Sequence, residues 1–255
     1  MRAEERFSPP PGECRAEGEG LRTGLDDCAP IWFFLDSGRC EAAYNMSLDE
    51  ALLEALPRLQ KPVLRFYGWS GPAATFGYFQ KMSEVEQVTS LRPLIRRPTG
   101  GGLVPHDADW TYSLGFPPGH EWHLLPAEES YRRIHEWLRL AFAHLGMESD
   151  LAPCCKKNLP GQCFVGHEKS DLLWRGRKIA GAAQRRNKLG LLIQGSVQPP
   201  PSAPGREDWE DAMRQAGSKA FGAEWRRLPS DLPLFTRAAG LACEKYSADA
   251  YNRKR

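Results

Sequence analysis

The apolar residues of this chain are divided into short runs, and the longest of them is Ile31 to Leu35. A helix that spans a membrane needs about 20 consecutive apolar residues, and the core of a signal peptide needs about 7–15. We therefore expect neither kind of segment in this chain. Short apolar runs between polar residues instead predict a globular fold of strands and amphipathic helices.

Segments with the period of a strand alternate with segments with the period of a helix. Helices are expected from a Ser47–Glu50 capping box onward, over Ala127–Leu145, and near residues 209–215 and 232–246. Strands are expected at residues 31–35, 63–69, 74–79, 94–97, 103–105, 110–116, 172–174, 178–184 and 189–197. This order, with several tight hairpins, predicts an α+β fold: a single domain with a central mixed or antiparallel sheet and flanking helices.

The first 30 residues differ in composition from the rest of the chain. They hold seven Asp and Glu, four Arg, four Gly and four Pro, with no periodic apolar positions. Residues 1–30 are therefore expected to be a disordered tail, and residues 31–255 the folded domain. The net charge of +2 gives no reason to expect nucleic acid or an anionic membrane as a partner. Seven cysteines without a secretory signal favour reduced thiols in the cytoplasm.

A triple glycine follows two arginines in the segment from Arg96 to Gly102, and His106 and Asp107 come shortly after it. Glycine allows backbone N–H groups to approach a ligand closely, and paired arginines bind carboxylate or phosphate. A plain glycine hairpin with two solvated arginines explains the same residues. The segment lacks the Lys-Ser/Thr of a P-loop, and it contains no dinucleotide fingerprint that opens a helix.

Two further groups of residues are candidates for chemistry. Cys154, Cys155, Cys163 and His167 could bind zinc, but adjacent cysteines lack the spacing of common zinc sites, and inert thiols are the alternative. Cys163 differs from the others because basic residues follow it, and cations stabilise a thiolate. Six Lys or Arg fall among residues 175–188. They fit a solvated edge strand better than a nucleic-acid surface, because no aromatic residues are interleaved with them.

Taken together, several segments resemble the superfamily of lipoate–protein ligase A, octanoyltransferases and biotin–protein ligases. The resemblance covers about residues 31–255 and is carried by residues 45–50, 64–69, 77–80, 96–106, 178–186, 195–196 and 244–252. It implies a biotin/lipoate ligase-like α+β fold around a mixed sheet, whose cleft holds a lipoyl, octanoyl or similar acyl group. The biotin branch is the most distant one, because its Gly-Arg-Gly-Arg-type loop is absent here.

The spacing of Cys163, Asp171 and Lys178 resembles the octanoyltransferases of the Gram-positive kind. This resemblance implies acyl transfer from an octanoyl-acyl carrier protein, or another acyl donor, through a Cys163 thioester to a lysine of a lipoyl-carrier domain. Cys163 and Lys178 would then be catalytic, and no cofactor, metal, nucleic acid or membrane is implied. The residues implied to bind the acyl group or ligand are Arg97, Thr99, Gly100, Gly101, Gly102, His106, Ala180 and Gly181.

Two alternatives remain open at this point. An ATP-dependent lipoate–protein ligase would form a lipoyl-adenylate with ATP and Mg²⁺, with Lys178 at the adenylate and Arg97 at the nucleotide. Gly102 agrees with the ligases and departs from the octanoyltransferases, in which arginine is common at this place. Gln194 stands where both branches commonly have histidine, and this departure keeps an inactive carrier-protein-binding module as the second alternative.

Overall fold

The computed structural model describes residues 29–157, 164 and 166–254. The predicted tail, residues 1–30, lies outside the described residues except for Ala29 and Pro30, and Cys163 lies outside them as well. Pro30 already belongs to the folded part, because its carbonyl oxygen accepts a hydrogen bond from the Glu224 N–H at 3.0 Å.

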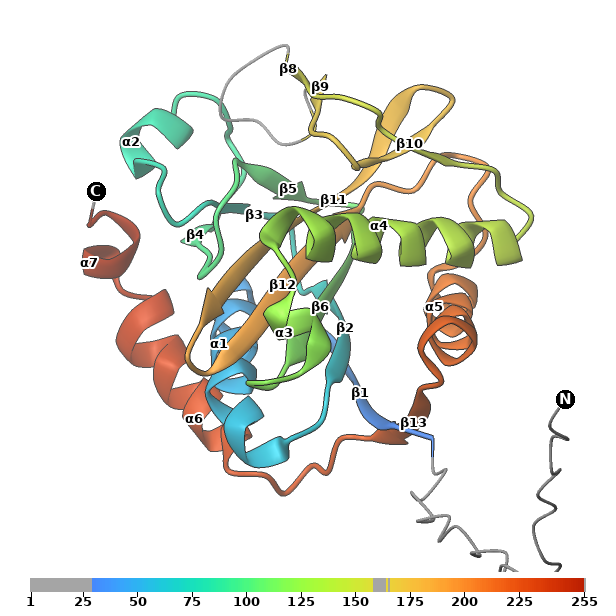
Figure 1. Ribbon diagram of the computed structural model, residues 1–255. Coiled ribbons are helices and arrows are strands. Elements are labelled where there is room, and N and C mark those ends of the chain that lie inside the picture. Colours follow the sequence, from blue (N-terminus) through green and yellow to red (C-terminus); the bar gives the residue numbers. More distant parts are fainter. Residues whose placement is uncertain (1–28, 158–163, 165, 255) are drawn as a thin grey trace, which may run out of the picture.

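A mixed sheet of eight strands forms the centre of the fold (Figure 1). Its order is β13 (Glu224–Arg227), β1 (Ile31–Cys40), β2 (Val63–Trp69), β6 (Trp110–Phe116), β12 (Gly190–Val197), β11 (Arg177–Asn187), β10 (Leu172–Trp174) and β7 (Asp150–Leu151). The pairs β1–β13 and β1–β2 are parallel, and the other pairs are antiparallel. The predicted α+β fold with a mixed central sheet is confirmed.

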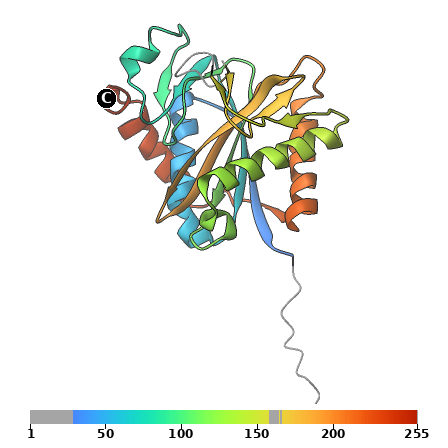
Figure 2. The ribbon, with the colours of Figure 1, turned by 45° about the horizontal axis from the view of Figure 1, so that its top comes forward.

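Two pairs of helices cover the two faces of this sheet. They are α1 (Ala42–Leu59) with α6 (Leu234–Leu241), and α4 (Ala127–His144) with α5 (Arg206–Phe221). Strand β2 shows how the sequence divides its side chains between them, since successive residues of a strand point to opposite faces. Leu64 and Phe66 pack in the apolar cluster of α4 and α5, while Val63 and Tyr67 pack in the cluster of α1 and α6. Figure 2 shows the two pairs on opposite sides of the sheet.

Two smaller sheets lie at one end of the main sheet, at the top of Figure 1. The first consists of β4 (Leu94–Arg96), β3 (Ala73–Phe76) and β5 (Val104–His106), and the second of β8 (Lys156–Lys157) and β9 (Gly166–His167). The short helices are α2 (Met82–Val85), α3 (Glu121–Leu124), the π-helical turn η1 (Ala242–Tyr246) and α7 (Asp249–Asn252). No helix among the described residues is both long and apolar enough to cross a membrane.

The start of α1 is the main correction to the sequence-based elements. Ser47 does not begin the helix, because α1 begins at Ala42 and the Ser47 hydroxyl donates to the Tyr44 carbonyl oxygen inside it. Glu50, the other half of the predicted capping box, accepts hydrogen bonds from Lys245 and Tyr246 instead. The Ser-x-x-Glu pattern fails as a start signal here because both side chains have partners elsewhere.

The other elements that were predicted differ from the structure mainly at their ends. The strand predicted at residues 31–35 extends to Cys40, and the strand predicted at residues 74–79 ends at Phe76. The helix predicted near residues 209–215 is longer in the structure, where α5 spans Arg206–Phe221. The helix predicted at residues 232–246 is divided into α6 and η1. Such ends depend on tertiary contacts more than on the local pattern.

Candidate active site

A cavity lies between the small sheet β4–β3–β5 and strands β11 and β12 of the main sheet. Its empty space, together with the open solvent at its mouth, is about 450 Å³. Its lining residues are Met46, Tyr67, Thr75, Arg97, Val104, His106, Thr111, Phe164, Lys178, Gly181, Ala182, Ala183, Gln194, Gly195 and Ser196. Met46, Val104 and Ala183 give it aliphatic walls, so the cavity suits an apolar chain with a polar end.

Lys178 on β11 belongs to the cavity wall and to a buried ion pair at the same time. Its Nζ lies 2.7 Å from Oδ2 of Asp171, and the two side chains are 6% and 0% exposed. The ring of Phe164 lies 5.0 Å from the same nitrogen, within cation–π distance. Gly181 leaves the space that the lysine occupies, because a Cβ at Gly181 would lie 2.7 Å from Nζ. A cation is therefore fixed at the cavity, with no side chain from position 181 in its way.

His106 on β5 forms a second polar part of the wall. Its Nδ1 lies 2.8 Å from Asp109 Oδ2, and its Nε2 lies 2.8 Å from Thr75 Oγ1. Because a carboxylate only accepts, Nδ1 carries a proton, and in the neutral imidazole Nε2 accepts from the Thr75 hydroxyl. The ring stacks on Trp69 with centroids 3.8 Å apart. Both nitrogens and the ring face are thus in contact, so His106 is a fixed wall group.

The glycine-rich segment adjoins the cavity and is held by backbone contacts. Arg97 donates to the Gly100 carbonyl oxygen at 2.5 and 3.0 Å, and to the Thr75 carbonyl oxygen at 3.3 Å. A Cβ at Gly77 would lie only 1.8 Å from the Gly101 carbonyl oxygen, so glycine is required at position 77 for the close approach of the two segments. Gly101 has a φ of 83°, a conformation that favours glycine.

Arg96 does not clamp a ligand anion as the sequence suggested. Its side chain is buried and donates to the carbonyl oxygens of Tyr78 and Gln80, both at 2.7 Å, and of Tyr251 and Asn252 at 3.3 and 2.8 Å. Its backbone N–H donates to Asn252 Oδ1 at 2.8 Å. The guanidinium therefore joins β4 to the 78–80 loop and to α7, which is a structural role.

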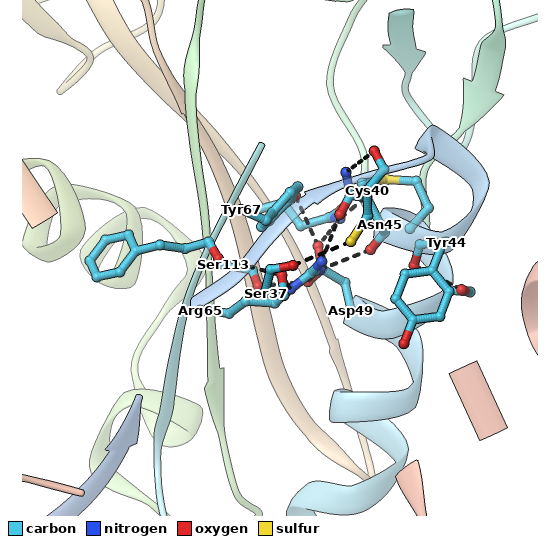
Figure 3. A network of polar contacts seen from close by, with 12 residues as sticks. Ser37, Cys40, Tyr44, Asn45, Asp49, Arg65, Tyr67 and Ser113 are labelled. Carbon is cyan, nitrogen blue, oxygen red and sulfur yellow. Dashed lines mark hydrogen bonds and ion pairs between the residues drawn. The ribbon is translucent and has the colours of Figure 1, made fainter. Parts of the chain in front are cut away.

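Asp49 on α1 is the centre of a polar network beneath the cavity (Figure 3). Its Oδ1 accepts from Arg65 and Ser113, both at 2.6 Å, and its Oδ2 accepts from Tyr67 at 3.0 Å and Gln194 at 2.6 Å. Burial and the Asp49 carboxylate raise the pKa of Tyr67 well above its usual value, so the phenol stays a donor. The amide of Gln194, in the place where histidine is common, completes this network without adding a titratable group.

The residues that the sequence singled out occupy three kinds of position. Lys178, Arg97, His106 and Gly181 line the cavity, and Thr99, Gly100, Gly101 and Gly102 belong to the adjoining segment. Ala180 packs in the apolar core, and Cys163 lies outside the described residues. Sequence reasoning missed the wall residues Met46, Tyr67 and Thr111. Polar residues inside otherwise apolar strands were the available signal for the last two.

The family model of the lipoyl protein ligase A/B catalytic domain matches residues 41–198. The chain belongs to this family. Octanoyltransferase LipM of Anoxybacillus flavithermus is 36% identical over 184 residues, which are 66% of this chain and 65% of that protein. The chain therefore spans just under two thirds of the length of the curated relatives that it matches.

Solved structures of the lipoyl ligase family share the fold. A lipoate-protein ligase A bound with ATP superposes with a TM-score of 0.72 at 20% identity, over 89% of this chain and 99% of that one. A putative lipoate protein ligase from T. acidophilum gives 0.73 at 19% identity, over 89% and 100%. At this identity the likeness concerns the fold alone.

Proposed function

We propose that the chain is an octanoyltransferase of protein lipoylation. It moves an octanoyl or lipoyl group from an acylated carrier protein, through a thioester of Cys163, to a lysine of a lipoyl-carrier domain. The observation that carries the proposal is the Lys178 amine, which Asp171 holds at the wall of a cavity with aliphatic sides. The 36% identity to an octanoyltransferase supports acyl transfer as the reaction.

In the first half of the reaction, the Cys163 thiolate attacks the thioester carbonyl of the donor. The new bond joins the Cys163 sulfur to the acyl carbon, and the bond to the donor sulfur breaks. The Lys178 ammonium then gives a proton to the departing sulfur, so that the carrier leaves as its thiol and Lys178 becomes neutral. The Lys178 ammonium stabilises the thiolate of Cys163 by its charge. Backbone N–H groups of the 100–102 segment or of β11 near Lys178 would hold the oxyanion, a contribution typically of about 3–4 kcal/mol.

In the second half, the lysine amine of the acceptor domain attacks the acyl carbon of the Cys163 thioester. A bond from nitrogen to carbon forms, the bond from carbon to the Cys163 sulfur breaks, and the amine loses a proton. Lys178 in its neutral form takes that proton, so its two protonation states serve the two halves of the reaction. The Asp171 carboxylate keeps the amine in place throughout.

The acyl group occupies the cavity, and the carrier domains dock outside it. Val104 and Ala183, which line the cavity, would contact the aliphatic chain. Arg175 and Arg177 are exposed at the turn from β10 to β11, beside Lys178, and attract acidic carrier domains. Arg186 on β11 is less available to a carrier domain than Arg175 and Arg177. Its guanidinium already donates to the Trp122 carbonyl oxygen and the Ser130 hydroxyl. Because salt screens the attraction between these arginines and the carrier domains, transfer should slow as the salt concentration rises.

Intact-mass spectrometry after incubation with an octanoyl thioester tests the proposal. One octanoyl group should add about 126 Da in a linkage that hydroxylamine cleaves. Cys163→Ser should remove the adduct, while the matched variants Cys154→Ser and Cys155→Ser should keep it. The wild type should also octanoylate a lipoyl domain, and it should do so without ATP.

The same experiment distinguishes the two alternatives from the proposal. A ligase would show no adduct, would require ATP and lipoate or octanoate, and would be nearly unaffected by Cys163→Ser. An inactive binding module would bind a lipoyl domain without acylating it under either condition. Either result would overturn the transferase proposal.

A further inference from the structure

The carboxylate of Asp171 is the centre of a buried cluster behind Lys178. Its Oδ2 faces the Lys178 amine at 2.7 Å and accepts a hydrogen bond from the Glu168 N–H at 2.6 Å. Its Oδ1 accepts a hydrogen bond from the Tyr131 hydroxyl at 2.5 Å. Because the Asp171 side chain is fully buried, each of its oxygens depends on donors from the protein.

Helix α4 supplies two of the groups that face this carboxylate. Tyr131 and His135 lie one turn apart on α4, and α4 packs against β10 and β11. Their rings are in contact, with centroids 4.3 Å apart, and His135 Nδ1 lies 2.8 Å from the Tyr131 carbonyl oxygen. Among the residues that the structure describes, Lys178 on β11 and Tyr112 on β6 also interact with Asp171.

Of the two groups from α4, Tyr131 is the one that forms the hydrogen bond. His135 Nε2 lies 4.0 Å from Asp171 Oδ1 and has no hydrogen-bond partner among the described residues. Burial lowers the pKa of His135 to about 4, so its imidazole is neutral near pH 7. Burial, together with the adjacent Asp171 carboxylate, raises the pKa of Tyr131 well above its usual value. The tyrosine hydroxyl therefore remains a donor over the whole working range of pH.

We propose that Tyr131 is a positioning residue for the reaction: its hydroxyl holds Oδ1 of Asp171, so that Oδ2 keeps the Lys178 amine at the cavity wall. Tyr131 is not among the residues that line the cavity, so it acts through Asp171. The importance of this contact for catalysis rests on the proposed function. Its effect on the lysine does not.

Removing the hydroxyl has a definite consequence because the site is buried. In a Tyr131→Phe variant, Oδ1 loses its hydrogen-bond donor, while Oδ2 keeps the Glu168 N–H and the Lys178 amine. Without that donor, the carboxylate can rotate away from the position that it holds beside Lys178. The Lys178 amine is then held less firmly at the cavity wall and reacts more readily with an added reagent.

The test measures the reactivity of the Lys178 amine with trace acetic anhydride at pH 8, by peptide mass spectrometry. Exposed Lys169 is the internal reference. In Tyr131→Phe, Lys178 should be labelled about three- to tenfold faster than in the wild type, because the loss of one buried hydrogen bond loosens the contact that holds its amine. Asp171→Asn, which removes the charge, should give a larger increase in the same direction.

Tyr112→Phe is the matched control. It also removes a buried phenol oxygen beside Asp171, but that oxygen has no hydrogen-bond partner among the described residues. In Tyr112→Phe, Lys178 should be labelled at the same rate as in the wild type. Equal or slower labelling in Tyr131→Phe, or an equal increase in Tyr112→Phe, would overturn the proposal.

Steady-state kinetics then connect the contact to the reaction. With saturating acyl donor, Tyr131→Phe should lower kcat about tenfold or more and change KM less than twofold, because the cavity walls are intact. A loss confined to KM would contradict a positioning role. The labelling needs no acyl substrate, so it remains interpretable even if octanoyl transfer itself is not found.

Discussion

Two buried aspartates in this protein are surrounded in different ways. Asp49 and Asp171 are both fully buried, and each faces one cation. Arg65 faces Asp49 inside the fold, and its guanidinium cannot release a proton in a protein. Lys178 faces Asp171 at a cavity wall, and an amine there can exchange protons with a substrate. The difference separates a carboxylate that stabilises the fold from one that orients a reactive group.

The largest effect is expected at the cation of the cavity. Lys178→Met should lower the rate of octanoyl transfer by about 10²–10⁴-fold, the usual loss when a positioned acid or base is removed. Circular dichroism should still show a folded chain. Exposed Lys169→Met is the matched control, and its rate should be unchanged. A Lys178→Met variant with more than a tenth of the wild-type rate would contradict the view that Asp171 orients a reactive group.

At the other aspartate, the same kind of change should act on stability. Arg65→Met leaves Asp49 as a buried carboxylate without its cation, and breaking a buried pair costs about 3–5 kcal/mol. Urea unfolding measures this loss. The exposed pair of Arg237 and Glu54 provides the control, because Arg237→Met should cost less than about 1 kcal/mol. Equal costs for the two variants would show that burial does not decide the effect.

The space at Gly181 offers a more local test of the Asp171 cluster. A Cβ in Gly181→Ala would lie 2.7 Å from the Lys178 amine and 3.3 Å from Asp171 Oδ1, so the lysine must move. A displacement of about 1 Å in a reacting group can cost about 10²-fold in rate. Gly240→Ala, where a Cβ would have open space, should leave transfer unchanged. Normal turnover by Gly181→Ala would mean that the lysine tolerates displacement.

The smallest effect is expected on the stability of the protein at acid pH. The imidazole of His135 lies beside Asp171, whereas no histidine is among the groups that donate to Asp49. The pKa of His135 is about 4 in the folded protein and near 6.5 in the unfolded chain, so the unfolded chain binds more protons between these values. The free energy of unfolding should therefore fall as pH falls through this range. From pH 7 to pH 5 this residue contributes a loss of about 2 kcal/mol. His135→Gln should reduce the measured pH dependence by that amount, and an unchanged dependence would contradict a buried neutral imidazole.

Much of the fold could be predicted because the local signals were strong. The strands Val63–Trp69 and Trp110–Phe116 have the predicted bounds, since apolar runs and turn residues mark both ends. The start of α1 could not be predicted, because Glu50 has its partners, Lys245 and Tyr246, almost 200 residues later. A local pattern cannot show which carboxylate caps a helix and which binds a distant segment.

The candidate site shows the same limit. Lys178 and Gly181 could be proposed from a resemblance and from small residues around a cation, and both lie at the cavity. Tyr131 lies within the helix predicted over Ala127–Leu145, and the sequence assigned it no role in the site. Its hydroxyl, with His135 one turn later, was a polar pair on the buried face of that helix, which implies a partner without naming it. Only the packing of α4 against β10 and β11 identifies that partner as Asp171.

The carbonyl oxygens that accept hydrogen bonds from Arg96 belong to residues that are synthesised at different times. Two of them, from Tyr251 and Asn252, belong to residues that the ribosome adds about 156 positions after Arg96. At about 5–20 residues per second this interval lasts roughly 8–30 s. Until then, part of the guanidinium lacks its acceptors, and the loop at Tyr78 and Gln80 is not yet fixed to α7. The nascent chain therefore completes the contacts of Arg96 late, after the strands of the main sheet from β1 to β12 have been made.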